Sequence, residues 1–231
     1  MSKLFFFFVL FYGMVFGQVN PQLKVSGIEG SYIPQGFDSN DNVQMVVEGV
    51  FKDTCSKPGP AQFAVNQATK TVEVLTTEYR YAGPCLDVLV PHDTVVNLGV
   101  LGQGTYRVMQ KNGRQLGSLV VQQALRATAD DYLYAPVSQV YLKNSGAQVS
   151  VTLSGSFSNS CMSMAQVLTR VQGNVIVVQP LAHYNKEASA CANVLVPFEK
   201  TVIINGVRPG RYLLHIRSLN GNSVNNLYNI R

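Results

Sequence analysis

The stretch CLDVLVP at residues 85–91 is nearly repeated as CANVLVP at residues 191–197, 106 residues further along the chain. The same offset aligns Cys55 with Cys161 and the apolar positions around them, without a gap. Two units of this length can each hold a core of their own, whereas the repeats of a solenoid are shorter. The repeat therefore predicts two tandem domains of one fold.

Each unit has the pattern of short strands. Residues 43–51 and 149–157 each place apolar residues and one glycine at every second position, and residues 149–157 do so more cleanly. Period two sends alternate side chains to the core and to solvent. The Asn-Gly pairs at residues 112–113 and 220–221 favour two-residue hairpins, because both central positions of such turns take positive φ. Further strand candidates are residues 70–76, 94–98, 104–109, 174–178, 201–204 and 210–216.

About seven short strands with regular turn signals in about 100 residues predict an antiparallel β-sandwich for each unit. The protein is then all-β, with two tandem antiparallel β-sandwich domains and one disulfide in each. Residues 18–126 are the expected first domain and residues 127–231 the second. Residues 122–134 break the alternation, so we expect the junction there.

Four cysteines allow three pairings. Equivalent positions in two copies of one fold should make equivalent bonds, so the repeat selects Cys55–Cys85 and Cys161–Cys191. Closing a loop of about 30 residues stabilises each domain by roughly 3–4 kcal/mol in the chain-entropy model. A redox or metal-binding set is not expected, because the chain has no Cys-x-x-Cys and no His at ligand spacing from a Cys.

The repeated Cys-x-x-Val-Leu-Val-Pro motif then has a structural interpretation. We expect a strand that leaves the disulfide, enters the core and ends at the proline. The motif is not expected to be catalytic.

The N-terminus has the form of a secretory signal peptide. Lys3 supplies a positive charge, residues 4–16 are an apolar run of thirteen, and a cut before Gln18 is expected. The run is shorter than the roughly 20 apolar residues that span a bilayer. We therefore expect signal residues 1–17, a periplasmic or extracellular protein, and no membrane span in the mature chain.

Charge gives little indication of a partner. The formal net charge is +5, or +4 without Lys3, and the Lys and Arg residues are scattered rather than clustered. Nucleic acid is therefore not an expected partner.

The Gly-x-Tyr sequences at residues 104–106 and 210–212 each stand at the start of a predicted strand. They resemble the tyrosine corner of immunoglobulin-like domains, in which the Tyr hydroxyl ties a corner back to the backbone. The Pro-Gly-x-Tyr version at residues 209–212 is also similar to the start of a strand in transthyretin-like sandwiches. The resemblance implies tandem sandwich domains of a secreted protein. The antibody-type Cys–Trp–Cys pattern is absent, because the chain has no Trp.

The chain has three histidines, and each is aligned with a different residue type in the other copy of the repeat. They are His92, His183 and His215. The chain contains neither Gly-x-Ser-x-Gly nor His-Glu-x-x-His, so an enzyme is not expected. Residues 38–42 resemble the start of a calcium loop but lack its glycine at the sixth place and its glutamate at the twelfth. No metal and no cofactor are therefore expected.

These observations favour a secreted, non-catalytic binding or structural protein of the cell envelope or extracellular space. Its partner would be a protein or a cell-surface polysaccharide. In such scaffolds, binding residues concentrate in loops. Tyr79, Arg80 and Tyr81 form an aromatic and basic cluster of the kind used at interfaces. The expected loops are residues 56–67, 77–84, 162–173 and 183–190.

Two alternatives stay open. One is a chaperone or inhibitor that acts through a sheet edge or a loop; in size, basic charge and two-domain layout the chain is similar to periplasmic pilus chaperones. The other is a hydrolase with a composite site around His92 or His183, because catalytic triads are set by geometry rather than by sequence order.

Overall fold

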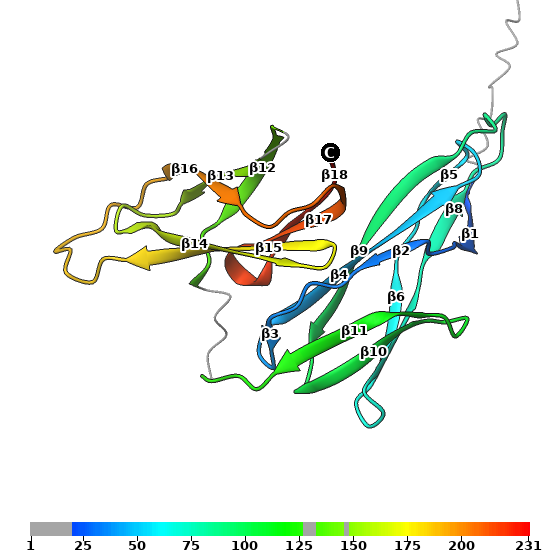
Figure 1. Ribbon diagram of the computed structural model, residues 1–231, viewed down its shortest axis with the longest axis horizontal. Coiled ribbons are helices and arrows are strands. Elements are labelled where there is room, and N and C mark those ends of the chain that lie inside the picture. Colours follow the sequence, from blue (N-terminus) through cyan, green and yellow to red (C-terminus); the bar gives the residue numbers. More distant parts are fainter. Residues whose placement is uncertain (1–19, 127–132, 146–147) are drawn as a thin grey trace, which may run out of the picture.

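The computed structural model describes residues 20–126, 133–145 and 148–231, which form strands with one 3₁₀ turn (Figure 1). The first half contains β1 (Gln22–Val25), β2 (Gly30–Tyr32), β3 (Phe37–Asp38), β4 (Asn42–Phe51), β5 (Ser56–Pro58), β6 (Gln62–Asn66), β7 (Thr71–Leu75), β8 (Thr77–Arg80), β9 (Val90–Val100), β10 (Gly104–Gln110) and β11 (Gln115–Gln122). The second half contains β12 (Val137–Asn144), β13 (Val149–Phe157), β14 (Met162–Gln172), β15 (Val175–Tyr184), β16 (Val196–Ile204), β17 (Gly210–Arg217), η2 (Leu219–Gly221) and β18 (Ser223–Ile230).

The signal peptide at residues 1–17 and the middle of the expected junction, residues 127–132, lie outside the described residues. The domain boundary between residues 126 and 127 stays a prediction. Within the described ranges, no helix has the length and apolar character that a membrane span needs.

Each half is a two-layer sandwich. In the first half, β2-β4-β9 packs on β3-β11-β10-β7-β6 around Met45, Val72 and Tyr106. In the second half, β12-β13-β16 packs on β14-β15-β17-β18 around Val151 and Leu214. The short sheet β1-β8-β5 extends the first half at its disulfide. The prediction of an all-β protein with two sandwich halves is confirmed.

Most neighbouring strands are antiparallel, as predicted, but three pairs are parallel. They are β3 with β11, β7 with β10, and β15 with β17. The last two pairs join equivalent strands of the two halves, so the parallel pairing belongs to the repeated fold.

Both halves place a ring over a glycine of the neighbouring strand. Gly49 pairs with His92 across β4 and β9, and Gly155 pairs with Phe198 across β13 and β16. A Cβ at Gly49 would lie 2.6 Å from a carbonyl oxygen, and one at Gly155 would lie 2.1 Å from another. The close approach of a second backbone therefore requires glycine at this position in both copies.

The two disulfides form as the repeat predicts. Cys55–Cys85 and Cys161–Cys191 each span 30 residues, with their Cα atoms 5.4 Å apart. Each half therefore carries one bridge at the same place in its fold.

Neither Asn-Gly pair forms the predicted two-residue hairpin, although the predicted positive φ occurs at both positions of the second pair. Asn220 and Gly221 both have positive φ, at 62° and 67°, between β17 and β18. The last paired residues of β17 and β18 are Arg217 and Ser223, so the connection between them is longer than two residues. Between β10 and β11, positive φ occurs at Gly113 but not at Asn112. There the Gly113 amide donates to the Gln110 carbonyl, which makes a longer loop than the predicted two-residue turn.

The tyrosine corner implied by the resemblance is present in the first half. The Tyr106 hydroxyl donates to the Gly102 carbonyl at 2.7 Å, and the ring is fully buried. Lys70 places its ammonium 4.9 Å from the centre of the same ring. The hydroxyl therefore ties the corner between β9 and β10 to the backbone, and the Lys70 ammonium packs against the same ring.

The two halves share a buried apolar contact. The first half supplies Tyr32 and Val46, and the second supplies Val175, Val177 and Leu213. These side chains project from the outer faces of the sandwich sheets, away from the two main cores. Strands β4 and β17 are therefore buried on both faces.

Arg217, at the end of β17, lies in the polar part of this interface. Its side chain is 5% exposed, and its Nη1 lies 3.3 Å from Oδ2 of Asp41 in the first half. Its Nη2 donates to the Gly36 carbonyl at 2.6 Å, and the guanidinium lies 4.4 Å over the Phe37 ring. One cation of the second half is thus held by three groups of the first.

His215 lies beside it, with 1% of its surface exposed. Its Nδ1 is 2.7 Å from Oδ1 of Asn225, and its ring meets Phe37 edge-on. Burial lowers the pKa of His215 from 6.5 to about 4, and the Arg217 charge acts in the same direction. The imidazole is therefore neutral in the docked structure at pH 7.

A third contact lies at the rim of the interface. Arg211 donates to Glu48 across the halves at 2.8 Å, with 41% of the arginine side chain exposed. The Tyr32 hydroxyl donates to the same carboxylate at 3.0 Å. Burial, together with this carboxylate, raises the pKa of Tyr32.

The variant Arg217→Met should lower the free energy of unfolding by about 3–5 kcal/mol, because it leaves the buried Asp41 carboxylate without its cation. The matched variant Arg211→Met, at the exposed rim, should cost at most about 1 kcal/mol. Urea denaturation of the two variants measures both values. Equal losses would contradict the assignment of Arg217 as the central contact.

Acid should weaken the protein through His215. Its folded pKa lies below its unfolded pKa, so its contribution is complete above pH 6.5 and is lost as the pH falls toward 4. The free energy of unfolding should fall by about 3 kcal/mol over this range from this group alone. His215→Met, which copies the residue aligned with it in the first half, should remove that part of the pH dependence. Urea titrations at several pH values test this, and an unchanged slope in the variant would exclude the group.

Candidate binding surface at the disulfide ends

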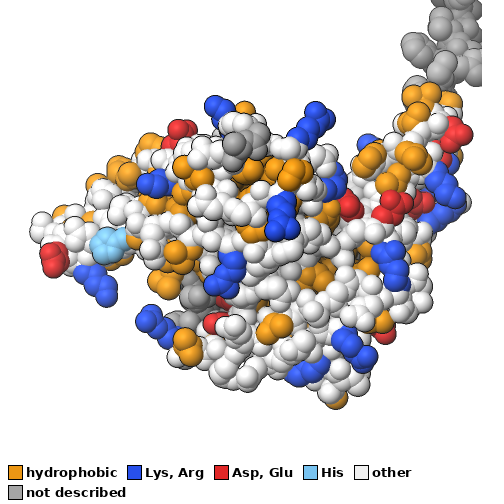
Figure 2. Space-filling view, viewed as in Figure 1, with side chains coloured by type: hydrophobic (Ala, Val, Ile, Leu, Met, Phe, Trp, Pro, Cys, Tyr) orange, Lys and Arg blue, Asp and Glu red, His pale blue; other side chains and the backbone are white. Residues whose placement is uncertain are grey.

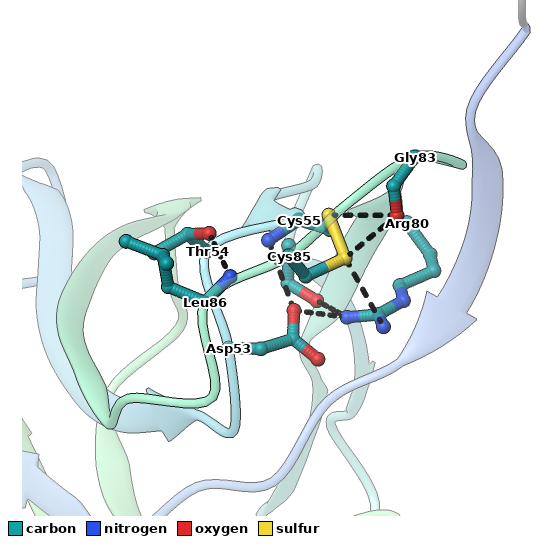
Figure 3. Close-up of a disulfide and its surroundings, with 8 residues drawn as sticks. Asp53, Thr54, Cys55, Arg80, Gly83, Cys85 and Leu86 are labelled. Atoms are coloured by element: carbon teal, nitrogen blue, oxygen red, sulfur yellow. Dashed lines mark hydrogen bonds and ion pairs between the residues drawn. A yellow bond between two sulfur atoms is a disulfide. The ribbon is translucent and has the colours of Figure 1, made fainter.

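The first disulfide joins the loop after β4 to the segment before β9 (Figure 3). The Thr54 amide donates to the Leu86 carbonyl at 3.2 Å, and the Leu86 amide donates to the Thr54 hydroxyl at 3.0 Å. The Val88 amide donates to the Leu86 carbonyl at 3.0 Å. These bonds satisfy the backbone of the segment locally, so it does not join a sheet.

The second half repeats this arrangement bond for bond. The Ser160 amide donates to the Ala192 carbonyl at 3.0 Å, and the Ala192 amide donates to the Ser160 hydroxyl at 2.9 Å. The Val194 amide donates to the Ala192 carbonyl at 3.0 Å. The repeat is therefore kept in loop geometry as well as in the strands.

The prediction that the Val-Leu-Val motif enters the core is wrong. Val88 and Leu89 are 50% and 75% exposed, and the equivalent Val194 and Leu195 are 51% and 76% exposed. Strands β9 and β16 begin only at the following valine. We name Leu86, Val88 and Leu89 tip 1, and Val194 and Leu195 tip 2. The two tips lie at opposite ends of the molecule, where Figure 2 shows hydrophobic side chains on the surface.

The sequence placed Tyr79, Arg80 and Tyr81 together in a loop, and this is wrong. Thr77–Arg80 is strand β8, which pairs with β1 and β5. Alternation along a strand sends Tyr79 and Arg80 to opposite faces. Tyr81 follows the strand and is 39% exposed. Arg80 therefore does not share a face with Tyr79, and the expected role of the three residues in binding stays a prediction.

The other expected loops are corrected in the same way. Residues 56–67 contain β5 and β6, and residues 162–173 contain β14. Residues 183–184 belong to β15, so that loop begins after Tyr184. Irregular sequence in these stretches reflects exposed strands rather than loops.

Arg80 turns inward beside the first disulfide (Figure 3). Its guanidinium donates to the Asp53 carboxylate and, at 3.2 Å, to the Ser56 hydroxyl. The hydrogen bond from Arg80 holds the pKa of the Asp53 carboxyl below its usual range, and the carboxylate raises the pKa of Arg80. In the second half, Asn159 and Lys186 stand at the aligned positions, so this ion pair is private to the first half.

A polar cleft of about 400 Å³ opens beside Arg80. Its charged lining residues are Lys24, Lys52, Asp53, Glu78 and Arg80. Cations and carboxylates are mixed in this cleft, so it does not select a ligand of one charge sign. It offers a polar rim beside tip 1.

Asp53, Cys55 and Cys85 place possible metal-ligand atoms within 4.8 Å of one another. Both sulfurs are bound in the disulfide. A metal is bound by a thiolate, so this set cannot ligate one while the disulfide is intact.

The histidines of the alternative hydrolase hypothesis lie on different strands. The His92 ring stacks on Phe51, with ring centres 3.7 Å apart, and burial lowers the pKa of His92. His183, on β15, pairs with Ser163 of β14. His92 thus packs as an aromatic ring in the position that Phe198 fills in the second half.

Comparison with known families reaches the same architecture. The family model of the ORF11 β-sandwich domain matches residues 45–121 and 151–230, one segment in each half. The chain belongs to the ORF11 β-sandwich domain family. No curated protein and no solved structure matches it. The ORF11 β-sandwich match begins within β4 and β13, the first long strands of the two halves, so the family covers both copies of the repeat.

The double variant Cys55→Ser/Cys85→Ser should lower the free energy of unfolding by roughly 3–4 kcal/mol. It should also speed hydrogen exchange at the Leu86 and Val88 amides, because the disulfide holds tip 1 against the Thr54 loop. Cys161→Ser/Cys191→Ser is the matched control, and it should speed exchange at tip 2 alone. Loss of protection at both ends in either variant would show that the tips are not held independently.

Proposed function

We propose that the protein is a secreted, non-catalytic binding protein that holds protein partners at its two apolar tips. The observation that carries the proposal is the matched exposure of Val88 and Val194, and of Leu89 and Leu195. Large aliphatic side chains gathered on a surface and rimmed by polar residues are typical of interaction sites.

The tips are built to keep these side chains exposed. In each half a disulfide and a pair of hydrogen bonds hold the loop backbone, so the side chains do not fold back onto the sandwich. A fixed loop loses little conformational entropy when it binds, which favours affinity. Burial of one leucine side chain in a partner contributes about 1.5–3 kcal/mol.

The chemistry of the tips favours a protein over a polysaccharide. Aliphatic side chains form no hydrogen bonds and fit the apolar core of a protein interface. A sugar presents hydroxyl groups that need polar partners, which are absent from Leu86, Val88 and Leu89 themselves. The mixed charges of the neighbouring cleft supply the polar rim that protein interfaces have.

The proposed location outside the cell is supported by two features. Residues 1–17 have the pattern of a signal peptide, and the chain carries two disulfides. Disulfides form and persist in oxidising compartments.

The test compares capture of partners from the extracellular fluid of the source by three forms of the protein. They are the wild type, the double variant Leu89→Ser/Leu195→Ser, and the control Leu125→Ser, which changes a leucine that is 96% exposed away from the tips. The captured species is identified, purified and titrated against each form. Wild type and control should bind one protein saturably, and the double variant should bind it at least about tenfold more weakly.

Equal binding by the double variant would contradict the assignment of the tips. Capture of polysaccharide alone would contradict the assignment of a protein partner. Single variants at Leu89 and Leu195 then separate the two tips.

A further inference from the structure

Strand β14 (Met162–Gln172) is a long edge strand. It is 11 residues in length and pairs with β15 on one side. In the part of the chain that the structure describes, no strand pairs with its other side. An edge of this kind presents backbone N–H and C=O groups that can pair with another strand.

The first half interrupts the same edge. At the offset of the repeat, β14 corresponds to residues 56–66, where β5 ends at Pro58 and Gly59 and Pro60 stand before β6. Proline cannot donate to a strand ladder, and short strands and prolines are the usual protection of a sheet edge. The two copies therefore differ at one edge. In the first half only the five residues of β6 form it, and in the second half it is continuous over the 11 residues of β14.

The continuous edge has little other protection. Arg170 is its one charged residue. A register shift between Met164 and Gln166 leaves residues 166–172 in regular pairing with β15. Leu168 lies in this regular part, with 46% of its surface exposed.

The end of the strand is also held in place. The Gln35 amide of the first half donates to the Gln172 side-chain carbonyl at 3.1 Å. This hydrogen bond ties the C-terminal end of the edge strand to the first half.

We propose that β14 pairs with β14 of a second copy of this chain, antiparallel about a two-fold axis at Leu168. This register places Leu168 opposite its own copy and Arg170 opposite Gln166. Because β14 carries one charge, away from the axis, no like charges face each other, which favours self-pairing. The contact joins the two four-stranded sheets into one continuous sheet. It is independent of the proposed function, because it uses neither tip.

A charge-swap experiment tests the pairing in solution. Leu168→Lys and Leu168→Glu each place like charges opposite each other at the axis, so each variant alone should associate at least about tenfold more weakly than the wild type. An equimolar mixture places a lysine opposite a glutamate and should form the dimer again. Sedimentation velocity of the purified protein, with both disulfides intact, measures all four samples.

The matched control is Gln62→Lys, because Gln62 occupies the position of Leu168 in the interrupted edge of the first half. This control should associate as the wild type does. Circular dichroism and the disulfide content check that every variant is folded.

Four outcomes would overturn the proposal, and the first three concern association. They are a monomeric wild type at millimolar concentration, a dimer that persists in both Leu168 variants, and monomeric variants that are not rescued by mixing. The fourth outcome is a monomer whose β14 amides are protected from hydrogen exchange only when an unrelated peptide strand is added. This result would assign the edge to a different partner.

Discussion

The buried guanidinium of Arg217 is the contact on which the arrangement of the whole protein depends. A cation that is removed from water is costly unless it is paired and hydrogen-bonded. Arg217 belongs to the second half, yet Asp41, the Gly36 carbonyl and the Phe37 ring belong to the first. Among the described residues, the carboxylate that compensates the charge lies in the other half, so the pairing requires the halves to be docked. The apolar contact of Tyr32 and Val46 with β15 and β17 provides the buried apolar area of the interface. Arg217 fixes the orientation of one half relative to the other.

Much of the fold could be predicted from the repeat. The offset of 106 residues gave two sandwiches and the correct pairing of four cysteines, because equivalent positions in one fold make equivalent bonds. The alternation of residues 149–157 located β13 directly. The interface between the halves could not be predicted in the same way. Residues 213–216 are buried in succession because both faces of β17 are covered, and this loss of alternation indicates burial without naming the partner.

The candidate site was harder to predict, because burial does not follow from apolar character alone. Apolar residues form much of any protein surface, so Val88 and Leu89 could not be placed by composition. Their exposure accompanies hydrogen bonds between Leu86 and Thr54, beside a disulfide that joins residues 30 positions apart, and such contacts are not visible in the local sequence. Tyr79 and Arg80 failed as a cluster for a simpler reason. They lie in a strand, where neighbours in sequence point to opposite faces.

The placement of the tips at opposite ends of docked sandwiches has a mechanical consequence. Two binding sites that are joined by a flexible linker sample a range of separations, and both can reach one surface. Here the distance between the two proposed sites is set by the length of two sandwiches and by the contact between them. The protein therefore has the form of a rigid spacer rather than a tether. Two molecules bound at its ends would be kept apart at a set distance, and neither end could fold back to the surface that the other occupies.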